Sequence, residues 1–304
     1  MTNRLSPDQV QSYRDQGYIL VERLIDAVTL DALRRETDAI VEAARSVEQN
    51  DAVYDLEDSH SPDTPRVRRI KTPRLHFPFF KTLSEYQPIL DVLGQLIGPD
   101  VRYQGDKLNL KSAEYGAPVE WHQDWAFYPH TNDDLLAAGV FLDDCDASNG
   151  PLLMIPGSHQ GPTYDHHADG AFCGAMEPES SGIDFDAAVQ VTGPAGSVSF
   201  HHTRIVHGSG LNTSGADRRL LLYQYAAADA WPLSGLGTRS LEDFDSWLVM
   251  GNGTTEPRLT DVPVRMPLPP AVHGGSIYEN QKATGRRFFE TYKSKSKPAP
   301  TRSS

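Results

Sequence analysis

Cysteines, long apolar runs and excess positive charge are all scarce in this sequence. Its 304 residues include two cysteines, Cys145 and Cys173, which are too few for a disulfide framework and favour a reducing, cytoplasmic location. No apolar run reaches the length of about 18 residues that a membrane helix needs, so we expect no membrane partner. With 28 Lys and Arg against 41 Asp and Glu, the net charge of −13 also argues against nucleic acid as a partner.

The composition that remains is typical of a globular protein. Hydrophobic residues make up 38% of the chain and charged residues 23%. We expect one domain over residues 1–292, with helices in 6–48, a core at about 101–228, and loop or lid segments at 46–75 and 232–265. Residues 293–304 have the composition of a disordered tail.

The core segment predicts a mainly β fold with flanking helices. Short apolar runs broken by Gly, Pro, Asn and Asp are typical of antiparallel strands in a sandwich or barrel, not of alternating β and α units. Strands are expected at residues 101–110, 136–143, 152–155, 197–200, 205–207 and 219–225. Before the core, Ser6 and Gly17 mark the ends of one helix, and Asp26 or Thr29 begins a second.

Three residues have the types and spacing of a metal site. His122 and Asp124 are two residues apart, so an extended chain projects both side chains to one face. His207 ends an apolar strand just before a glycine-rich turn. Two histidines and one carboxylate form the facial triad that holds non-haem Fe(II) with open positions. A lone His-X-Asp pair is more often a hydrogen-bonded surface couple, so the prediction depends on all three residues meeting.

Arg218, eleven residues after His207, heads the strand that continues to residue 225. Alternation places Arg218, Leu220, Leu222 and Gln224 on one face of that strand. Beside an iron site, a guanidinium is suited to a bidentate clamp on the far carboxylate of 2-oxoglutarate. Taken alone, Arg218 is better interpreted as a surface charge at a strand end.

These residues resemble the phytanoyl-CoA dioxygenase family of Fe(II)/2-oxoglutarate oxygenases. His122-Gln123-Asp124, His207 and Arg218 match the family's frame, as do the segments NGPLLMIPGSH at 149–159 and HGSGLN at 207–212. The similarity covers roughly residues 5–230. It implies a double-stranded β-helix, a cupin-like jelly roll, with His122, Asp124 and His207 as iron ligands and Arg218 as the cosubstrate anchor.

The resemblance also implies the reaction. Fe(II), 2-oxoglutarate and O2 would hydroxylate an aliphatic C–H bond and release succinate and CO2, and ascorbate is expected to stimulate turnover. Related halogenases replace the carboxylate of the triad with a small residue, so Asp124 favours hydroxylation. Ser209 resembles a hydroxyl that helps to orient the oxoglutarate carboxylate in relatives.

Several further residues are weaker candidates. Lys107 and Asn109 alternate with Lys111, so the first two are expected either to face the cosubstrate or substrate or to lie on a solvated edge strand. Either Trp125 or Phe127 is expected to reach the substrate, and Gln224 joins them because it shares the face of Arg218. The pairs at 166–167 and 201–202 are interpreted as surface or supporting imidazoles, because neighbours on a strand face opposite ways.

The substrate is predicted to be a small soluble metabolite: an amino acid, a small acid or phosphonate, or a secondary metabolite. A basic cluster at residues 66–71 keeps an anionic substrate open. Two other functions fit the ligand set, namely a non-catalytic, cupin-like metal-binding protein and a zinc hydrolase. Only the oxygenase needs Arg218 as an anchor. A monomer or a homodimer is expected.

Overall fold

The computed structural model describes residues 4–113, 116–237, 239–271, 280 and 288–289. The predicted tail at 293–304 lies outside these residues. No helix in this described part is both long and apolar enough to cross a membrane.

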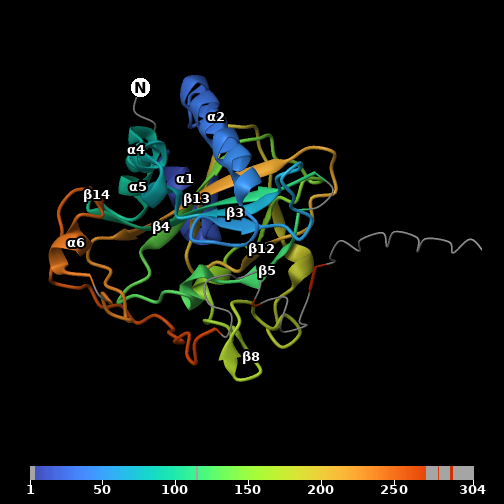
Figure 1. The fold of residues 1–304 in the computed structure, drawn as a ribbon. Coiled ribbons are helices and arrows are strands. Elements are labelled where there is room, and N and C mark those ends of the chain that lie inside the picture. The colour runs from blue at the N-terminus through green and yellow to red at the C-terminus, as the bar shows by residue number, and fades with distance from the viewer. Residues whose placement is uncertain (1–3, 114–115, 238, 272–279, 281–287, 290–304) are drawn as a thin grey trace, which may run out of the picture.

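Helices cluster at the amino-terminal end of the described chain, and strands dominate the rest (Figure 1). The α-helices are α1 (Pro7–Gln16), α2 (Ala27–Ala43), α3 (Pro73–His76), α4 (Pro78–Ser84), α5 (Gln87–Leu96) and α6 (Leu241–Asp245). The strands are β1 (Tyr18–Val21), β2 (Tyr54–Leu56), β3 (Val67–Lys71), β4 (Val101–Lys111), β5 (Val119–His122), β6 (Leu135–Phe141), β7 (Leu152–Met154), β8 (His167–Ala168), β9 (Ala171–Phe172), β10 (Val189–Val191), β11 (Val198–His202), β12 (His207–Ser209), β13 (Arg218–Ala227) and β14 (Leu248–Met250).

Two antiparallel sheets form the core of the molecule. The larger has the order β1-β11-β6-β13-β4-β3-β2, with β14 also paired to β4, and the smaller has the order β10-β7-β12-β5. Apolar side chains of β6 and β13 pack against those of β7 and β10, so the two sheets face each other across a shared interior. This is the double-stranded β-helix that the sequence predicted.

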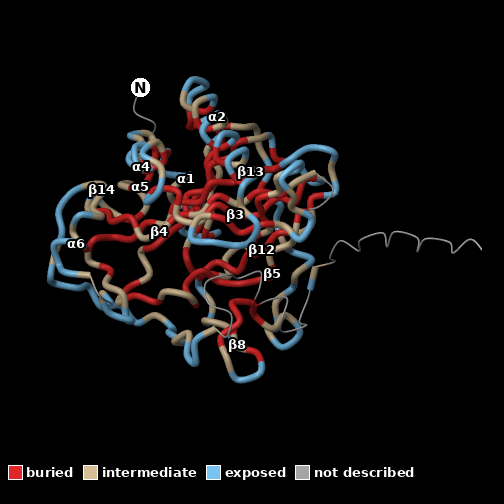
Figure 2. Tube along the Cα trace, in the orientation of Figure 1, coloured by how far each residue is buried: buried red, intermediate tan, exposed pale blue. Residues whose placement is uncertain are grey.

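The other face of the larger sheet is covered by helices, and its strands are buried through the centre of the molecule (Figure 2). Along β13, Leu221, Tyr223 and Tyr225 belong to this helix-covered cluster, whereas Leu220 and Leu222 belong to the cluster between the sheets. The predicted alternation of β13 is therefore confirmed, and it sets the side chains of Arg218, Leu220 and Leu222 toward the pocket between the sheets.

The expected loop at residues 46–75 is wrong in part, because β2 and β3 extend the larger sheet beyond β4. The many charged residues of this segment made its sequence resemble that of a loop. Asp55 of β2 pairs with Arg69 of β3 at 2.5 Å and with Lys71 at 3.2 Å, and this pairing lets a charged strand be buried. The expected loop at residues 232–265 likewise contains α6 and β14.

Candidate active site

The pairing of β5 with β12 brings the two predicted histidine ligands together. His122 and His207 lie directly opposite in the register of this antiparallel pair, and their ring centroids are 4.1 Å apart. Gln123 is extended, so the Asp124 side chain returns to the same side as that of His122. One ligand atom from each of His122, Asp124 and His207 lies within 4.8 Å of the others, and all three residues are buried.

Backbone carbonyls fix the orientation of both imidazoles. Nδ1 of His122 lies 2.8 Å from the Glu120 carbonyl oxygen, and Nδ1 of His207 lies 3.1 Å from that of Ile205. A carbonyl oxygen only accepts a hydrogen bond, so each Nδ1 carries the proton and donates it. Each Nε2 then keeps its lone pair, which is the form that binds a metal ion.

The electrostatics of the cluster suit a cation. Burial lowers the pKa of both His122 and His207, which keeps the imidazoles neutral. Burial alone would raise the pKa of Asp124, but the Lys107 ammonium and the nearby imidazoles outweigh it and hold that pKa below its usual range. The site thus offers two neutral nitrogen ligands and one ionised carboxylate without metal-induced deprotonation.

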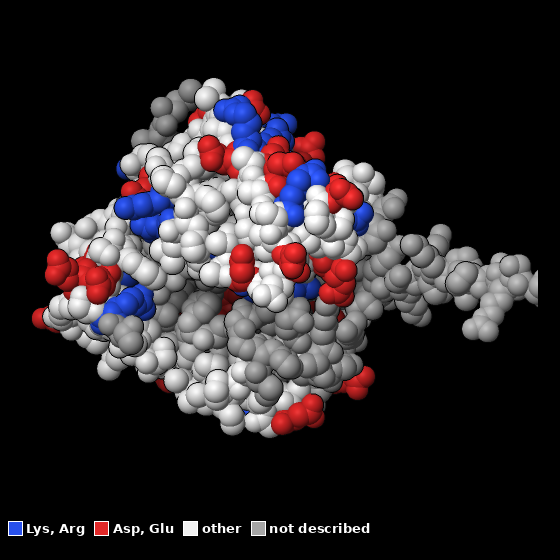
Figure 3. Space-filling view, viewed as in Figure 1, with Lys and Arg blue, Asp and Glu red and all other residues white. Residues whose placement is uncertain are grey.

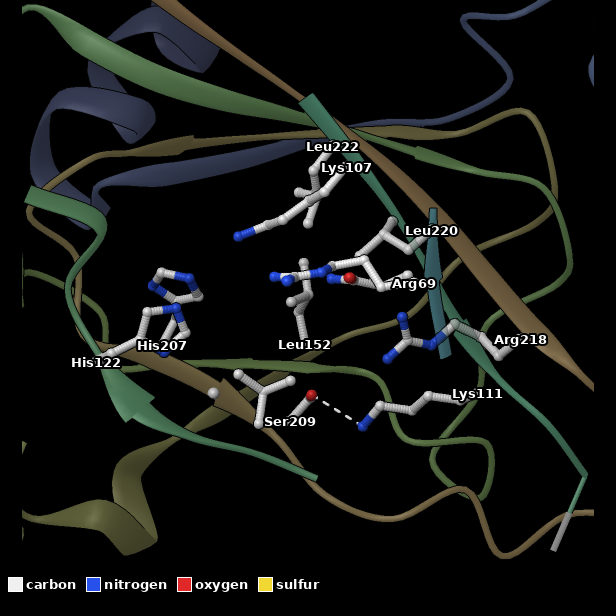
Figure 4. A pocket seen from close by; sticks show the side chains of 13 residues that line it. Arg69, Lys107, Lys111, His122, Leu152, His207, Ser209, Arg218, Leu220 and Leu222 are labelled. Atoms are coloured by element: carbon white, nitrogen blue, oxygen red, sulfur yellow. Dashed lines mark hydrogen bonds between the residues drawn. The ribbon is translucent and has the colours of Figure 1, made fainter. Parts of the chain in front are cut away.

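A pocket between the sheets opens beside these ligands and contains Arg218, which is 3% exposed, at its far end (Figure 4). Next to Arg218, the Lys111 ammonium donates a hydrogen bond of 2.9 Å to the Ser209 hydroxyl. Two of the predicted cosubstrate residues, Arg218 and Ser209, therefore line the same pocket as the histidines. Lys111 was given no role from the sequence, although its alternation with Lys107 and Asn109 placed it on their face.

The segment Asn149-Gly150-Pro151 holds the Arg218 side chain in place. The Arg218 guanidinium donates a hydrogen bond to the Gly150 carbonyl oxygen. Gly150 has a φ of +73°, and a Cβ there would lie 2.9 Å from the Gly210 carbonyl oxygen and 3.0 Å from that of Leu211. Only glycine fits this backbone, and the absence of a side chain at Gly150 lets the turn after β12 lie close to the segment that holds Arg218.

Lys107 and Asn109 also line the pocket. They lie on β4, which is flanked by β13 and β3, so the alternative of a solvated edge strand is wrong. The Asn109 Oδ1 atom is buried without a hydrogen-bond partner. Lys107 points toward the two histidines, away from the end of the pocket at which Arg218 lies (Figure 4).

The three predicted substrate residues lie outside the lining of this pocket. Trp125 is completely buried in a cluster with Leu135, and its Nε1 donates to the Pro263 carbonyl oxygen at 2.9 Å. Phe127 is nearer the metal cluster, with its ring edge-on to His122 at a centroid distance of 6.1 Å. The Gln224 amide donates a hydrogen bond to the Tyr128 hydroxyl.

Two histidines that the sequence analysis did not assign as metal ligands lie next to the ligand segment. His166 accepts a hydrogen bond of 2.9 Å from the backbone N–H of Gln123, which fixes the chain between His122 and Asp124. His201 is 1% exposed, and its Nε2 lies 4.0 Å from an Asp124 carboxylate oxygen. Both are supporting imidazoles as expected, although they are buried rather than at the surface.

The face of the molecule seen in Figure 3 gives no hint of this basic interior. On the face seen in Figure 3, acidic and basic side chains lie side by side around α2. Within the pocket, by contrast, four cationic side chains and no carboxylate appear among the described lining residues, the cations being Arg69, Lys107, Lys111 and Arg218.

Comparisons with known proteins identify the family of the chain. The family model for phytanoyl-CoA dioxygenase (PhyH) matches residues 13–220. The chain is 38% identical over 286 residues to a probable alpha-ketoglutarate-dependent hypophosphite dioxygenase of Stutzerimonas stutzeri, covering 93% of this chain and 99% of that protein. It is 28% identical to an ectoine dioxygenase of Bordetella parapertussis, over 69% of this chain and 71% of that one.

Solved structures share the fold. The crystal structure of EctD from S. alaskensis with 2-oxoglutarate and 5-hydroxyectoine has a TM-score of 0.63 and 23% identity, covering 85% of this chain and 88% of that chain. The fold and the buried cluster thus define the class, and the protein is a non-haem iron, 2-oxoglutarate-dependent dioxygenase. Within that class, the chain belongs to the phytanoyl-CoA dioxygenase family.

Proposed function

We propose that His122, Asp124 and His207 hold Fe(II) through the two Nε2 atoms and one carboxylate oxygen. The donor set fits this ion, since two neutral imidazoles and an ionised carboxylate converge within 4.8 Å in a buried cluster. Three protein ligands leave open positions for the cosubstrate and for O2. When bound together, these groups supply an oxidation that places one oxygen atom in the substrate and the other in succinate, with loss of CO2.

The far carboxylate of 2-oxoglutarate is received by Arg218, with Lys111 and Ser209 beside it. Arg218 is buried, lines the pocket, and is oriented by the Gly150 carbonyl oxygen. A planar guanidinium matches a carboxylate in two parallel hydrogen bonds. The single observation that carries this proposal is that two of the three metal ligands, His122 and His207, line the same pocket as Arg218, because a metal-binding protein or a zinc hydrolase needs no such anchor.

The substrate is a small soluble molecule. Relatives named for hypophosphite and ectoine, both small soluble molecules, support this. Hypophosphite is the first substrate to test because of the relative that is 38% identical. Oxidation of one P–H bond of this singly charged anion would give phosphite, whereas the sequence alone predicted oxidation of an aliphatic C–H bond.

Four properties follow from the sequence and are part of the proposal. Residues 1–292 act as one domain, in the cytoplasm, as a monomer or homodimer. Neither nucleic acid nor a membrane takes part in the reaction, in keeping with the net charge of −13.

Succinate formation from the purified chain with Fe(II), 2-oxoglutarate and ascorbate tests the activity. We expect it to rise on addition of one member of a panel of hypophosphite, ectoine and free amino acids, with matching oxidised product by nuclear magnetic resonance. Failure of the whole panel to raise succinate above its uncoupled level would count against the proposal.

Asp124→Ala tests the ligand assignment in the same assay. We expect coupled turnover to fall to background while the circular dichroism spectrum is retained. Asp134→Ala is a matched control, because Asp134 is a carboxylate paired with Arg258 outside the pocket. Full activity of Asp124→Ala, or an equal loss in Asp134→Ala, would contradict the assignment.

A further inference from the structure

The cations that line the pocket differ in whether the protein gives them a partner. Three of the four have an acceptor: Arg69 pairs with Asp55, Lys111 donates to Ser209, and Arg218 donates to the Gly150 carbonyl oxygen. Lys107 makes no hydrogen bond and no salt bridge with any residue that the structure describes. Its ammonium is aimed into the pocket, toward His122 and His207 (Figure 4).

The sheet holds Lys107 rigidly in this position. In the middle of β4, it lies in register between Lys71 of β3 and Leu222 of β13, and the adjacent Leu108 is fully buried on the helix-covered face. The register fixes the backbone of Lys107, and its side chain is half-buried. Moving an ammonium out of water costs free energy unless an acceptor is supplied.

The electrostatic environment of Lys107 favours the binding of a negatively charged group. Burial lowers the pKa of Lys107, and the Asp124 carboxylate opposes this shift. Asp124, however, is assigned to the metal ion, so the metal already balances the negative charge of this carboxylate. An anion brought by a ligand would supply the missing partner.

A count of charges indicates which ligand that is. Fe(II), the Asp124 carboxylate and the two carboxylates of 2-oxoglutarate together carry one net negative charge, which Arg218 offsets. Asp55 offsets Arg69, and Lys111 donates to the Ser209 hydroxyl near Arg218, where burial and the Arg218 charge lower its pKa well below the usual value. After the cosubstrate has bound, the positive charge of Lys107 beside the metal ligands is therefore not balanced by a negative charge.

We propose that Lys107 is the substrate-anchoring residue, and that its ammonium holds one oxygen of a compact, singly charged oxyanion beside the metal. This inference rests on the proposed function and narrows the substrate class from any small molecule to a small monoanion. The sequence predicted that Lys107 faces either the cosubstrate or the substrate. The structure points its side chain toward His122 and His207 and away from Arg218 (Figure 4).

Lys107→Met, which keeps the length of the side chain and removes its charge, tests this role in the anaerobic Fe(II)-loaded enzyme. We measure 2-oxoglutarate binding by the charge-transfer band, and then the binding of hypophosphite and of formate by the change in that band and by calorimetry. Loss of a hydrogen bond to a charged group predicts about 10- to 150-fold weaker hypophosphite binding. The dissociation constant of 2-oxoglutarate should change by less than about threefold.

Two further variants control for charge and folding. Lys81→Met removes the same charge from the exposed surface of α4 and should leave both dissociation constants unchanged. Lys107→Gln provides a second neutral side chain that should weaken the anion in the same way. Without substrate, Lys107→Met should be at least as stable to heat as the unchanged protein, because a half-buried cation without a hydrogen-bond partner has been removed.

The outcomes are distinguishable. Equal weakening of 2-oxoglutarate and hypophosphite would make Lys107 a cosubstrate residue and overturn the inference. Failure of either anion to bind the unchanged Fe(II)–2-oxoglutarate enzyme would overturn it as well, while leaving the oxygenase assignment intact. Absence of the charge-transfer band itself would overturn both.

Discussion

Replacement of Arg218 by Met should weaken 2-oxoglutarate far more than it weakens the fold. The guanidinium is 3% exposed and lines the pocket beside Lys111 and Ser209. Loss of one partner of a buried, hydrogen-bonded charge pair costs about 2–5 kcal/mol. Lys111 and Ser209 remain to hold the carboxylate, so we take the lower part of this range, about 2–3 kcal/mol, which corresponds to a dissociation constant about 30- to 150-fold higher.

The neighbouring arginine offers a matched control. Arg219 lies on the opposite face of β13, where it pairs with Asp143 at 2.7 Å and Asp38 at 2.6 Å. Arg219→Met changes the net charge equally and should leave 2-oxoglutarate binding within about threefold, by calorimetry on the anaerobic Fe(II)-loaded protein. An Arg218→Met dissociation constant close to that of the unchanged protein, or an equal loss in Arg219→Met, would refute the assigned anchor.

Two further predictions concern the frame around the site. Gly150→Ala places a Cβ 2.9 Å from the Gly210 carbonyl oxygen at a φ of +73°. The free energy of unfolding in urea should therefore fall by about 1–3 kcal/mol, and 2-oxoglutarate should bind more weakly. Gly215→Ala, which has open space around it, should change neither quantity. Burial lowers the pKa of His130 and of His166 from 6.5 to about 4. Below pH 6.5, the unfolded chain therefore binds protons that the folded chain does not bind. The metal-free protein should therefore lose up to about 1.4 kcal/mol per pH unit for each of these histidines as the pH falls from 6.5 toward 4, and an unchanged melting temperature between pH 7 and 5 would contradict this.

Local signals in the sequence were enough for the elements that surround the site. The capping box of Ser6 and the left-handed Gly17 delimit α1 as predicted, and the alternation of β13 put Arg218 on the correct face. These features depend on neighbours within a few residues. For that reason they are visible without knowledge of which distant strands pair.

Features that depend on long-range pairing were less accessible. β5 has four residues and was not predicted as a strand, yet its register with β12 is what sets His122 opposite His207. β3 was interpreted as part of a loop because its charges are neutralised by Asp55 from another strand, a partner that periodicity does not reveal. The role of Lys111 was missed for the same reason, since its bond to Ser209 spans the two sheets.

The most direct test of the metal centre is an anaerobic titration of the protein with Fe(II) and then 2-oxoglutarate, followed by visible absorption. Chelation of the cosubstrate at a ferrous ion held by His122, Asp124 and His207 predicts a charge-transfer band that saturates at one equivalent and is lost in His207→Ala. A featureless spectrum from the unchanged protein, or an undiminished band from His207→Ala, would contradict the account.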